Sequence, residues 1–255
     1  VVKIDYFSIT YQQLEKLVAD DVVSLMEELG AAVEEERSKM TQQMGETLFE
    51  LYLSLKELKH FKQLIPLKDS KPLALTNFHD WFQMSINKWL QIVYEKSCER
   101  ITKAVMVDQL APVDTLSKHS SSAVDVVTCF TQIKSFWLQL AWPDPMGAFV
   151  FVTKITDDIC NAAVMYSEMV RQKADDQKKI TQQLCIALNN IEHVHTYTWN
   201  LPKELDWQGV EASLEQLCGQ EGKQQVQRAL GTQLQSIDAG MQRQSNYMIN
   251  QLVEK

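Results

Sequence analysis

The hydrophobic residues of this chain recur mostly three and four positions apart, with polar residues between them. That spacing places them on one face of an α-helix, and no segment shows the period-two alternation that is typical of a half-buried strand. The pattern predicts a series of helical segments. They cover residues 10–30, 33–64, 78–108, 123–140, 145–173, 180–200, 206–217 and 223–255. The predicted fold class is all-α.

The breaks between these segments are short. Glycine occurs 8 times and proline 6 times in 255 residues, so the predicted helices are long and seldom interrupted. Short connections between long helices favour antiparallel neighbours. Because a helix rises about 1.5 Å per residue, a helix of about thirty residues reaches roughly 45 Å. We therefore expect an elongated stack of long antiparallel helices, closer to a rod than to a globule.

The polar segment ADDQKK, residues 174–179, is the strongest internal boundary that the sequence offers. It predicts one helical segment over residues 1–175 and a following helical subdomain over residues 180–255. The chain begins with Val1 rather than methionine, and its last residues keep the helical spacing. We interpret the chain as a segment of a larger cytosolic protein.

Two motifs predict where helices begin. In KHSSSAVD, Ser122 and Asp125 have the S-x-x-D spacing of a capping box directly before an apolar run. In AWPDP, Asp144 precedes Pro145, and aspartate at the N-cap followed by proline at the first helical position is a favoured helix start. The first stretch also holds the residue types of a hydrolytic triad. Triad members are usually distant in sequence, with the nucleophile on an elbow such as GxSxG, so we favour the cap.

Charge and cysteine content narrow the function classes. The formal net charge of −8 disfavours a nucleic-acid binder, which needs a basic face to neutralise phosphates. The 5 cysteines are scattered without a CxxC pair, as expected for reduced thiols rather than for a disulfide framework or a zinc site. No apolar run is long enough to span a membrane. We predict no cofactor and no catalysis.

A metal site is the chemical alternative that the residues leave open. Glu57 with His60, and Glu192 with His195, each form the E-x-x-H pair that di-iron carboxylate bundles use on two of their helices. Such a site also needs two further inward-facing glutamates. The alternative function is therefore a di-iron helical-bundle enzyme.

Several consecutive stretches resemble one protein family. They are LFELYLSLKELKHFKQLIPL, FHDWFQMSINKWL, DQLAPVD, KHSSSAVDVVTCFTQI, QLAWPDPMGAFVFVTKITDDIC and QLCIALNNIEHV. Together they resemble the central part of the MUN domain, with the first Munc homology region, of the Munc-thirteen (uncoordinated-thirteen) family. The resemblance is closest to the non-neuronal granule-secretion branch and to the brain-angiogenesis-inhibitor-associated relatives.

The resemblance implies a helical rod like those of vesicle-tethering complexes. It also implies a non-catalytic platform that promotes SNARE assembly and vesicle priming in regulated exocytosis. The implied partners are syntaxin, other SNARE proteins and a Sec1/Munc18-type protein, with no nucleic acid. The implied location is cytoplasmic and peripheral at vesicle and plasma membranes, which such proteins contact through flanking domains absent from this chain. A general coiled-coil tethering scaffold is a further alternative.

A partner-binding patch is predicted near the start of the third helical segment. Members of the family carry a syntaxin-contacting Asn-x-x-Phe pair, and the matching region of this chain has no such pair. The nearest local combination is Asn77 with Phe78, followed by Trp81. Because exposed aromatic residues are enriched in binding hot spots, these three residues are the predicted partner-binding patch.

Overall fold

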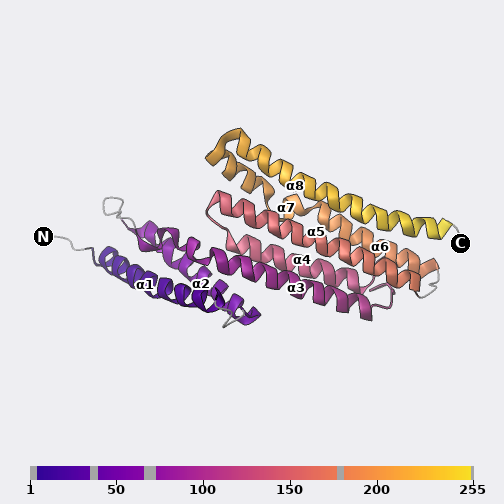
Figure 1. The fold of residues 1–255 in the computed structure, drawn as a ribbon, viewed down its shortest axis with the longest axis horizontal. Helices are drawn as coiled ribbons and strands as arrows, with labels where there is room; N and C mark the ends of the chain where they lie inside the picture. The colour runs from indigo at the N-terminus through magenta and orange to yellow at the C-terminus, as the bar shows by residue number, and fades with distance from the viewer. Residues whose placement is uncertain (1–4, 35–39, 66–72, 177–180, 254–255) are drawn as a thin grey trace. The chain divides into compact units, whose positions relative to one another are not determined.

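The computed structural model describes residues 5–34, 40–65, 73–176 and 181–253 (Figure 1). These residues are almost entirely helical and contain no strand, which confirms the all-α prediction. The chain forms two compact units, residues 1–92 and 93–255. The boundary between the units lies inside helix α3 (Gln83–Val107), and not at the polar segment 174–179 where the sequence placed it. The helices on either side of that segment pack together within the second unit.

The first unit contains α1 (Tyr6–Glu34), α2 (Gln42–His60), the 3₁₀ segments η1 (Phe61–Leu64) and η3 (Ala74–Phe82), and the start of α3. Helix α1 begins before the predicted position, because Asp5 accepts a hydrogen bond from the backbone N–H of Ser8 at 3.2 Å. Such a side-chain acceptor satisfies a donor that the first turn leaves free.

Aromatic side chains fill the core of the first unit. The rings of Tyr52 and Phe78 lie 5.2 Å apart, and Phe82 packs edge-on against both. Burial raises the pKa of Tyr52 to about 12. The start of η3 is fixed from α1, because the Glu15 carboxylate accepts from the backbone N–H groups of Ala74 and Leu75. Phe78 and Phe82 of η3 are therefore part of the core.

The second unit is a stack of long helices. It comprises the remainder of α3, α4 (Ser121–Leu140), α5 (Pro145–Asp176), α6 (Thr181–Trp199), the short α7 (Leu201–Glu204) and α8 (Trp207–Val253). Helix α5 packs against α4, α6 and α8, so it lies at the centre of this stack (Figure 1). The apolar residues that recur at helical spacing along α5 are buried. They are Phe149, Val152, Ile155, Ile159, Ala163, Tyr166 and Val170.

Helix α8 contains the two helices that the sequence separated near residue 220. Gly219 has φ 67° and ψ −158°, a conformation that only glycine adopts readily, and the helix direction changes there. The two arms then approach closely, because a Cβ atom on Gly222 would lie 2.8 Å from the carbonyl oxygen of Leu214. The result is a helical hairpin whose tip projects from the second unit (Figure 1).

The AWPDP turn joins α4 to α5 as its sequence suggests. Helix α5 begins at Pro145, and Asp144 Oδ2 accepts from the backbone N–H of Gly147 at 2.6 Å. Helix α4 ends at Leu140, and its C-cap residue Ala141 has the left-handed conformation, with φ 42° and ψ 58°. This short turn makes α4 and α5 antiparallel neighbours.

The predicted cap at Ser122 and Asp125 is wrong. Helix α4 begins two residues earlier than predicted, at Ser121, with Ser120 as its N-cap residue. The hydroxyl group of Ser122 donates instead to Asp108 Oδ2 at 2.5 Å, inside the core. Asp125 therefore lies beyond the first turn and does not close a capping box. The Ser122 hydroxyl group bonds to the buried Asp108 carboxylate rather than to the backbone of its own helix. Leaving that carboxylate unpaired would cost more free energy than leaving a helix end to water.

The hydroxyl group of Ser122 should contribute measurably to stability. We expect Ser122→Ala to lower the free energy of unfolding by about 1 to 3 kcal/mol, because buried Asp108 and Tyr166 lose a hydrogen-bond partner. Urea unfolding followed by circular dichroism measures this change. The control is Ser121→Ala at the exposed neighbouring position, with an expected effect within about 0.5 kcal/mol. Equal effects of the two variants would contradict a structural role for the Ser122 hydroxyl group.

Candidate functional site

The predicted partner-binding patch is only partly accessible. Phe78 is 2% exposed and packs within the aromatic core, so the expectation that it is an exposed anchor is wrong. Asn77 is exposed and Trp81 is half-buried. Hydrophobic spacing could not reveal this difference, because η3 is a 3₁₀ segment interrupted at Asn77 and does not follow the α-helical repeat. Asn77 and Trp81 remain predicted contacts.

The residues of the hypothetical metal site have separate surroundings. Glu57 and His60 are exposed on α2 in the first unit. On α6 in the second unit, Glu192 is exposed, whereas His195 is buried with its Nε2 atom 3.0 Å from Asp238 Oδ1. Across the described parts of the chain, no three or more His, Cys, Asp and Glu side chains gather where they could hold a metal ion. The geometry therefore supplies no support for the di-iron alternative.

Ser120 and Ser122 of the KHSSSAVD stretch belong to a buried hydrogen-bond network. Asp108, which follows α3, accepts from the hydroxyl groups of Ser120 and Ser122, each at 2.5 Å. Since Ser122 gives its only hydroxyl proton to Asp108, the 2.9 Å contact with Tyr166 has the tyrosine as donor. Asn190 on α6 donates to Ser120 Oγ and accepts from its backbone N–H. Burial raises the pKa of Tyr166.

This network is structural rather than nucleophilic. Both serine hydroxyl groups are committed to a carboxylate, whereas a catalytic serine hydroxyl needs a general base such as histidine. The nearby His119 instead stacks on His193 of α6, with ring centroids 4.0 Å apart and an angle of 15° between the planes. The network joins the end of α3 and the start of α4 to α5 and α6.

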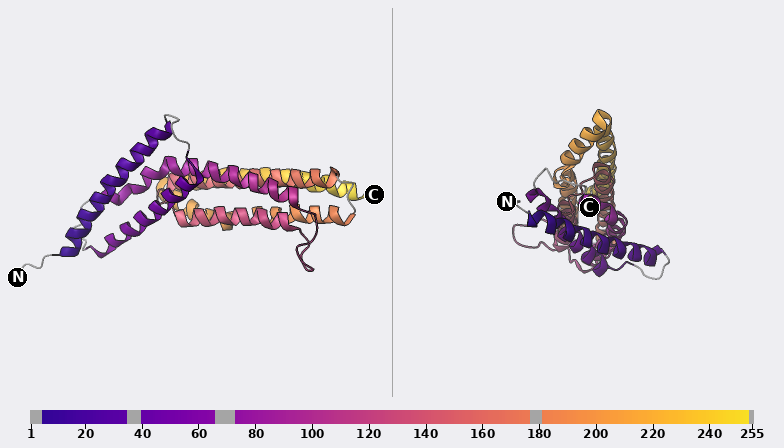
Figure 2. Two further views of the ribbon diagram at one scale, coloured as in Figure 1. Left: turned by 90° about the horizontal axis from the view of Figure 1, so that it is seen from below. Right: turned by 90° about the vertical axis from the view of Figure 1, so that its left-hand side faces the viewer.

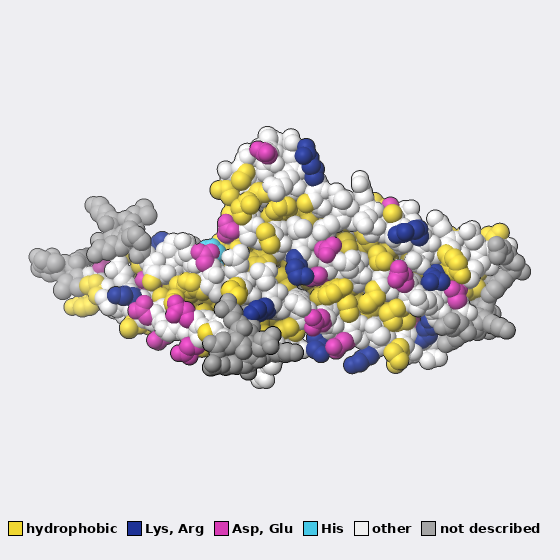
Figure 3. Space-filling view, viewed as in Figure 1, with side chains coloured by type: hydrophobic (Ala, Val, Ile, Leu, Met, Phe, Trp, Pro, Cys, Tyr) yellow, Lys and Arg dark blue, Asp and Glu magenta, His cyan; other side chains and the backbone are white. Residues whose placement is uncertain are grey.

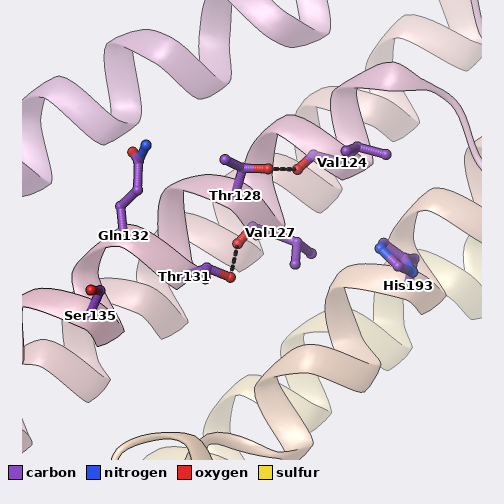
Figure 4. A pocket seen from close by; sticks show the side chains of 7 residues that line it. All are labelled: Val124, Val127, Thr128, Thr131, Gln132, Ser135 and His193. Atoms are coloured by element: carbon purple, nitrogen blue, oxygen red, sulfur yellow. Dashed lines mark hydrogen bonds between the residues drawn. The ribbon is translucent and has the colours of Figure 1, made fainter. Parts of the chain in front are cut away.

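A groove between α4 and α6 is the best candidate for a binding site. Figure 4 shows the side chains that line it, and its volume is about 300 Å³. Six come from α4 and one from α6. They are Val124, Val127, Thr128, Thr131, Gln132, Ser135 and His193. None is acidic, and none is lysine or arginine, so the groove has an uncharged lining apart from the titratable His193.

Two threonines of the lining present little hydrogen-bonding capacity to the groove, although threonine is a polar residue. Thr128 and Thr131 each donate their hydroxyl proton to the carbonyl oxygen four residues earlier, at 2.8 Å. The hydroxyl protons of both threonines are therefore taken up by the helix itself. On the α3 side, Arg100 donates to Gln132 at 3.2 Å and places a cation beside the groove.

A second hollow continues along α4. It has a volume of about 290 Å³ and lies between the end of α4, the AWPDP turn and the first arm of α8. Leu138 and Pro143 are among its lining residues, and Leu138 is 47% exposed. Hydrophobic side chains gather below the α8 hairpin in the space-filling view (Figure 3). Val124 and Leu138 are the exposed apolar residues near the two ends of this face of α4. At the usual rise of about 1.5 Å per residue, they lie about 21 Å apart along the helix axis.

Sequence reasoning missed this surface, although a signal was present. The outward positions of α4 carry valine, threonine, glutamine, serine and leucine. Lys134, the one basic residue of the helix, forms an ion pair with Glu204 of α7. A solvent-facing helix normally alternates charges on its outer face. Because charged side chains are scarce on the outer face of α4, that face is a candidate binding surface.

Comparisons with known proteins agree with the resemblance seen in the sequence. A family model described as the MUN domain matches residues 8–255. The chain is 38% identical over 263 residues to protein unc-13 homolog D of Rattus norvegicus, a match covering 100% of the chain and 23% of the relative. It is 35% identical over 260 residues to BAI1-associated protein 3 of Mus musculus, covering 100% of the chain and 21% of the relative.

A fly protein matches a shorter stretch. Protein unc-13 homolog 4B of Drosophila melanogaster is 41% identical over 171 residues, covering 64% of the chain and 15% of the relative. The chain thus spans less than a quarter of the length of these curated relatives. Within the described residues, no helix combines the length and apolar character needed to cross a bilayer.

Replacing the buried Phe78 should affect stability. We expect Phe78→Ala to lower the free energy of unfolding of the first unit by about 3 to 5 kcal/mol, because a large cavity replaces a core ring. Chemical unfolding monitored by tryptophan fluorescence measures the loss. The exposed neighbour supplies a control, since Asn77→Ala should change stability by less than about 0.5 kcal/mol. If Phe78→Ala had the same free energy of unfolding as the wild type, the aromatic core described above would be contradicted.

The stacked histidines should make stability depend on pH. Burial, and secondarily the charge of His119, lowers the pKa of His193. The unfolded chain therefore binds more protons than the folded chain as pH falls below about 7, and folding weakens. Between pH 7.5 and 5.5 the wild type should lose more stability than His193→Phe. The control Thr196→Val changes an exposed, non-titratable residue on the same helix and should follow the wild-type profile. Parallel profiles for all three proteins would rule out this contribution.

Proposed function

Because this chain belongs to the MUN domain family, we propose that it is a non-catalytic binding platform that promotes SNARE assembly during vesicle priming in regulated exocytosis. Its partners are syntaxin, other SNARE proteins and a Sec1/Munc18-type protein. It acts peripherally at vesicle and plasma membranes. The observation that carries the proposal is the uncharged groove along α4, which offers a rigid helical surface to a partner segment.

The dimensions of the α4 surface suit a helical or extended peptide. SNARE segments are amphipathic, and an amphipathic helix binds by placing its apolar face in a groove. An outer face of about 21 Å accommodates about four turns of such a helix. Val124 and Leu138, which are 40% and 47% exposed, are the apolar contacts near the two ends of this face.

The energy available is modest but sufficient for regulated binding. Burying one large apolar side chain contributes about 1.5 to 3 kcal/mol, whereas micromolar affinity corresponds to about −8 kcal/mol after the entropy of association is included. Several contacts along the groove are therefore required together. A binding platform of this kind favours one conformation of its partner by binding that conformation more tightly. No bond-making step is needed.

A charge placed in the groove should weaken partner binding. We expect Thr128→Lys to raise the dissociation constant for syntaxin at least about tenfold, because a buried unpaired ammonium group opposes apolar contact. Thr128 and Thr232 are both exposed helical threonines whose hydroxyl groups donate four residues back, so Thr232→Lys on α8 is a matched control. Isothermal titration calorimetry measures both variants, with circular dichroism to verify folding.

The same titrations test the scaffold alternative. Equal affinities of Thr128→Lys and Thr232→Lys for syntaxin would remove the α4 groove from the proposal. Wild-type protein should bind SNARE segments and not unrelated coiled coils. If unrelated coiled coils bind equally well, the chain is a general tethering scaffold.

Changing the exposed Asn77 and half-buried Trp81 together tests whether the first unit adds a contact with syntaxin.

A further inference from the structure

The loop between α3 and α4 projects from the helices of the second unit (Figure 2). Both of its ends are anchored in the core. Ser120 donates to Asp108 at 2.5 Å and so joins the two ends of the loop directly. Leu110 is 1% exposed and has a φ of 50°, a left-handed conformation that turns the chain outward immediately after its buried side chain. We call residues 109–119 the Leu116 loop.

Hydrogen bonds order the Leu116 loop beyond its base. The backbone N–H of Val113 donates to the carbonyl oxygen of His119 at 3.2 Å. Asp114 Oδ1 accepts from the backbone N–H groups of Leu116 and Ser117 at 2.8 and 2.7 Å, which forms a tight turn at the tip. On α6, Asn189 donates to the carbonyl oxygen of Lys118 at 2.9 Å.

This ordered backbone presents apolar side chains to solvent. Leu116 is 92% exposed and Val113 is 51% exposed. Near the base of the loop, Met106 and Val107 at the end of α3 are each 71% exposed. A single exposed leucine on a surface is ordinary. Here Leu116 and Val113 lie on one projecting loop, and the fixed shape of the loop lowers the entropy lost when its tip binds a partner or a surface.

Charge indicates the kind of surface that the tip fits. The negative charge of Asp114 lies against two backbone N–H groups, and these hydrogen bonds lower its pKa. Lys118 in the loop and Lys103 near the end of α3 are both exposed cations. The loop therefore combines projecting apolar side chains with one exposed lysine, Lys118, and Lys103 lies one helical turn before Met106 and Val107 on α3. That combination matches the interface of an anionic bilayer, where apolar groups insert and lysines meet headgroups.

We propose that the Leu116 loop contacts an anionic lipid surface, with Leu116 and Val113 inserted among the headgroups and Lys118 beside them. A convex tip fits a bilayer without shape complementarity, whereas a protein partner would need a matching cavity. Two apolar side chains and a lysine bind a membrane weakly and reversibly. The contact therefore serves to orient a protein that other domains already hold at the membrane. It adds a lipid contact within this chain to those expected of flanking domains.

Vesicle binding of the 255-residue chain tests the proposal directly. The probes are vesicles of phosphatidylcholine alone and vesicles with about one third phosphatidylserine, at millimolar lipid. We expect the wild type to co-sediment with the anionic vesicles and not with the neutral ones. Leu116→Asp should lower the partition coefficient at least about fivefold, and Lys118→Glu should lower it as well. Leu217→Asp, at the exposed tip of the α8 hairpin, is the matched control and should bind as the wild type does.

Insertion is measured separately from adsorption. The emission of the tryptophan added in Leu116→Trp is obtained by subtracting the wild-type spectrum. This emission should shift to shorter wavelength on anionic vesicles and be quenched by brominated lipid. The tryptophan added in Leu217→Trp should show neither effect. Absence of wild-type binding to anionic vesicles overturns the proposal, as does equal binding of Leu116→Asp and wild type. If Leu116→Asp weakens syntaxin binding and leaves vesicle binding intact, the tip contacts protein and the lipid proposal is also wrong. The variants change exposed side chains, and circular dichroism verifies their folding.

Discussion

The buried carboxyl group of Asp108 is at the centre of the hydrogen-bond network that connects four helices of the second unit. It accepts hydrogen bonds from Ser120 and Ser122, which in turn contact Asn190 on α6 and Tyr166 on α5. All five side chains are at most 3% exposed, so a lost partner cannot be replaced by bulk water. Every member of the network has a hydrogen-bond partner only when these side chains are placed as observed. That placement determines where α3 ends and where α4 begins.

The candidate binding surface follows from this constraint. Helix α4 is fixed at its start by the Asp108 network and at its end by the left-handed Ala141 and the Asp144 cap of α5. Between these points its inner face packs into the core, where Trp137 donates to the carbonyl oxygen of Leu205. The outer face carries few charged side chains and is left open at the groove. A surface held in this way loses little entropy on binding, which suits a platform that selects one conformation of its partner.

The same network produces the projecting loop. With Asp108 and Ser120 bonded to each other, the chain between them has to leave the core and return to the same place. It emerges after the buried Leu110 and returns through His119, which stacks on His193 at the edge of the α4 groove. The groove and the Leu116 loop are consequently neighbours in structure. The two surfaces for which binding is proposed, the α4 groove and the Leu116 loop, therefore lie beside each other in the second unit.

Local spacing along the sequence determined the all-α class, the buried stripe of α5, the AWPDP turn and the break near Gly219, because helical periodicity and turn chemistry are properties of neighbouring residues. The resemblance to the MUN domain was also contained in the sequence. Only the tertiary structure decided that Phe78 is buried, that Ser122 pairs with Tyr166 44 positions away, and that the units divide inside α3. Which apolar side chain is covered, and which acceptor a hydroxyl group finds, depends on segments brought together from distant parts of the chain.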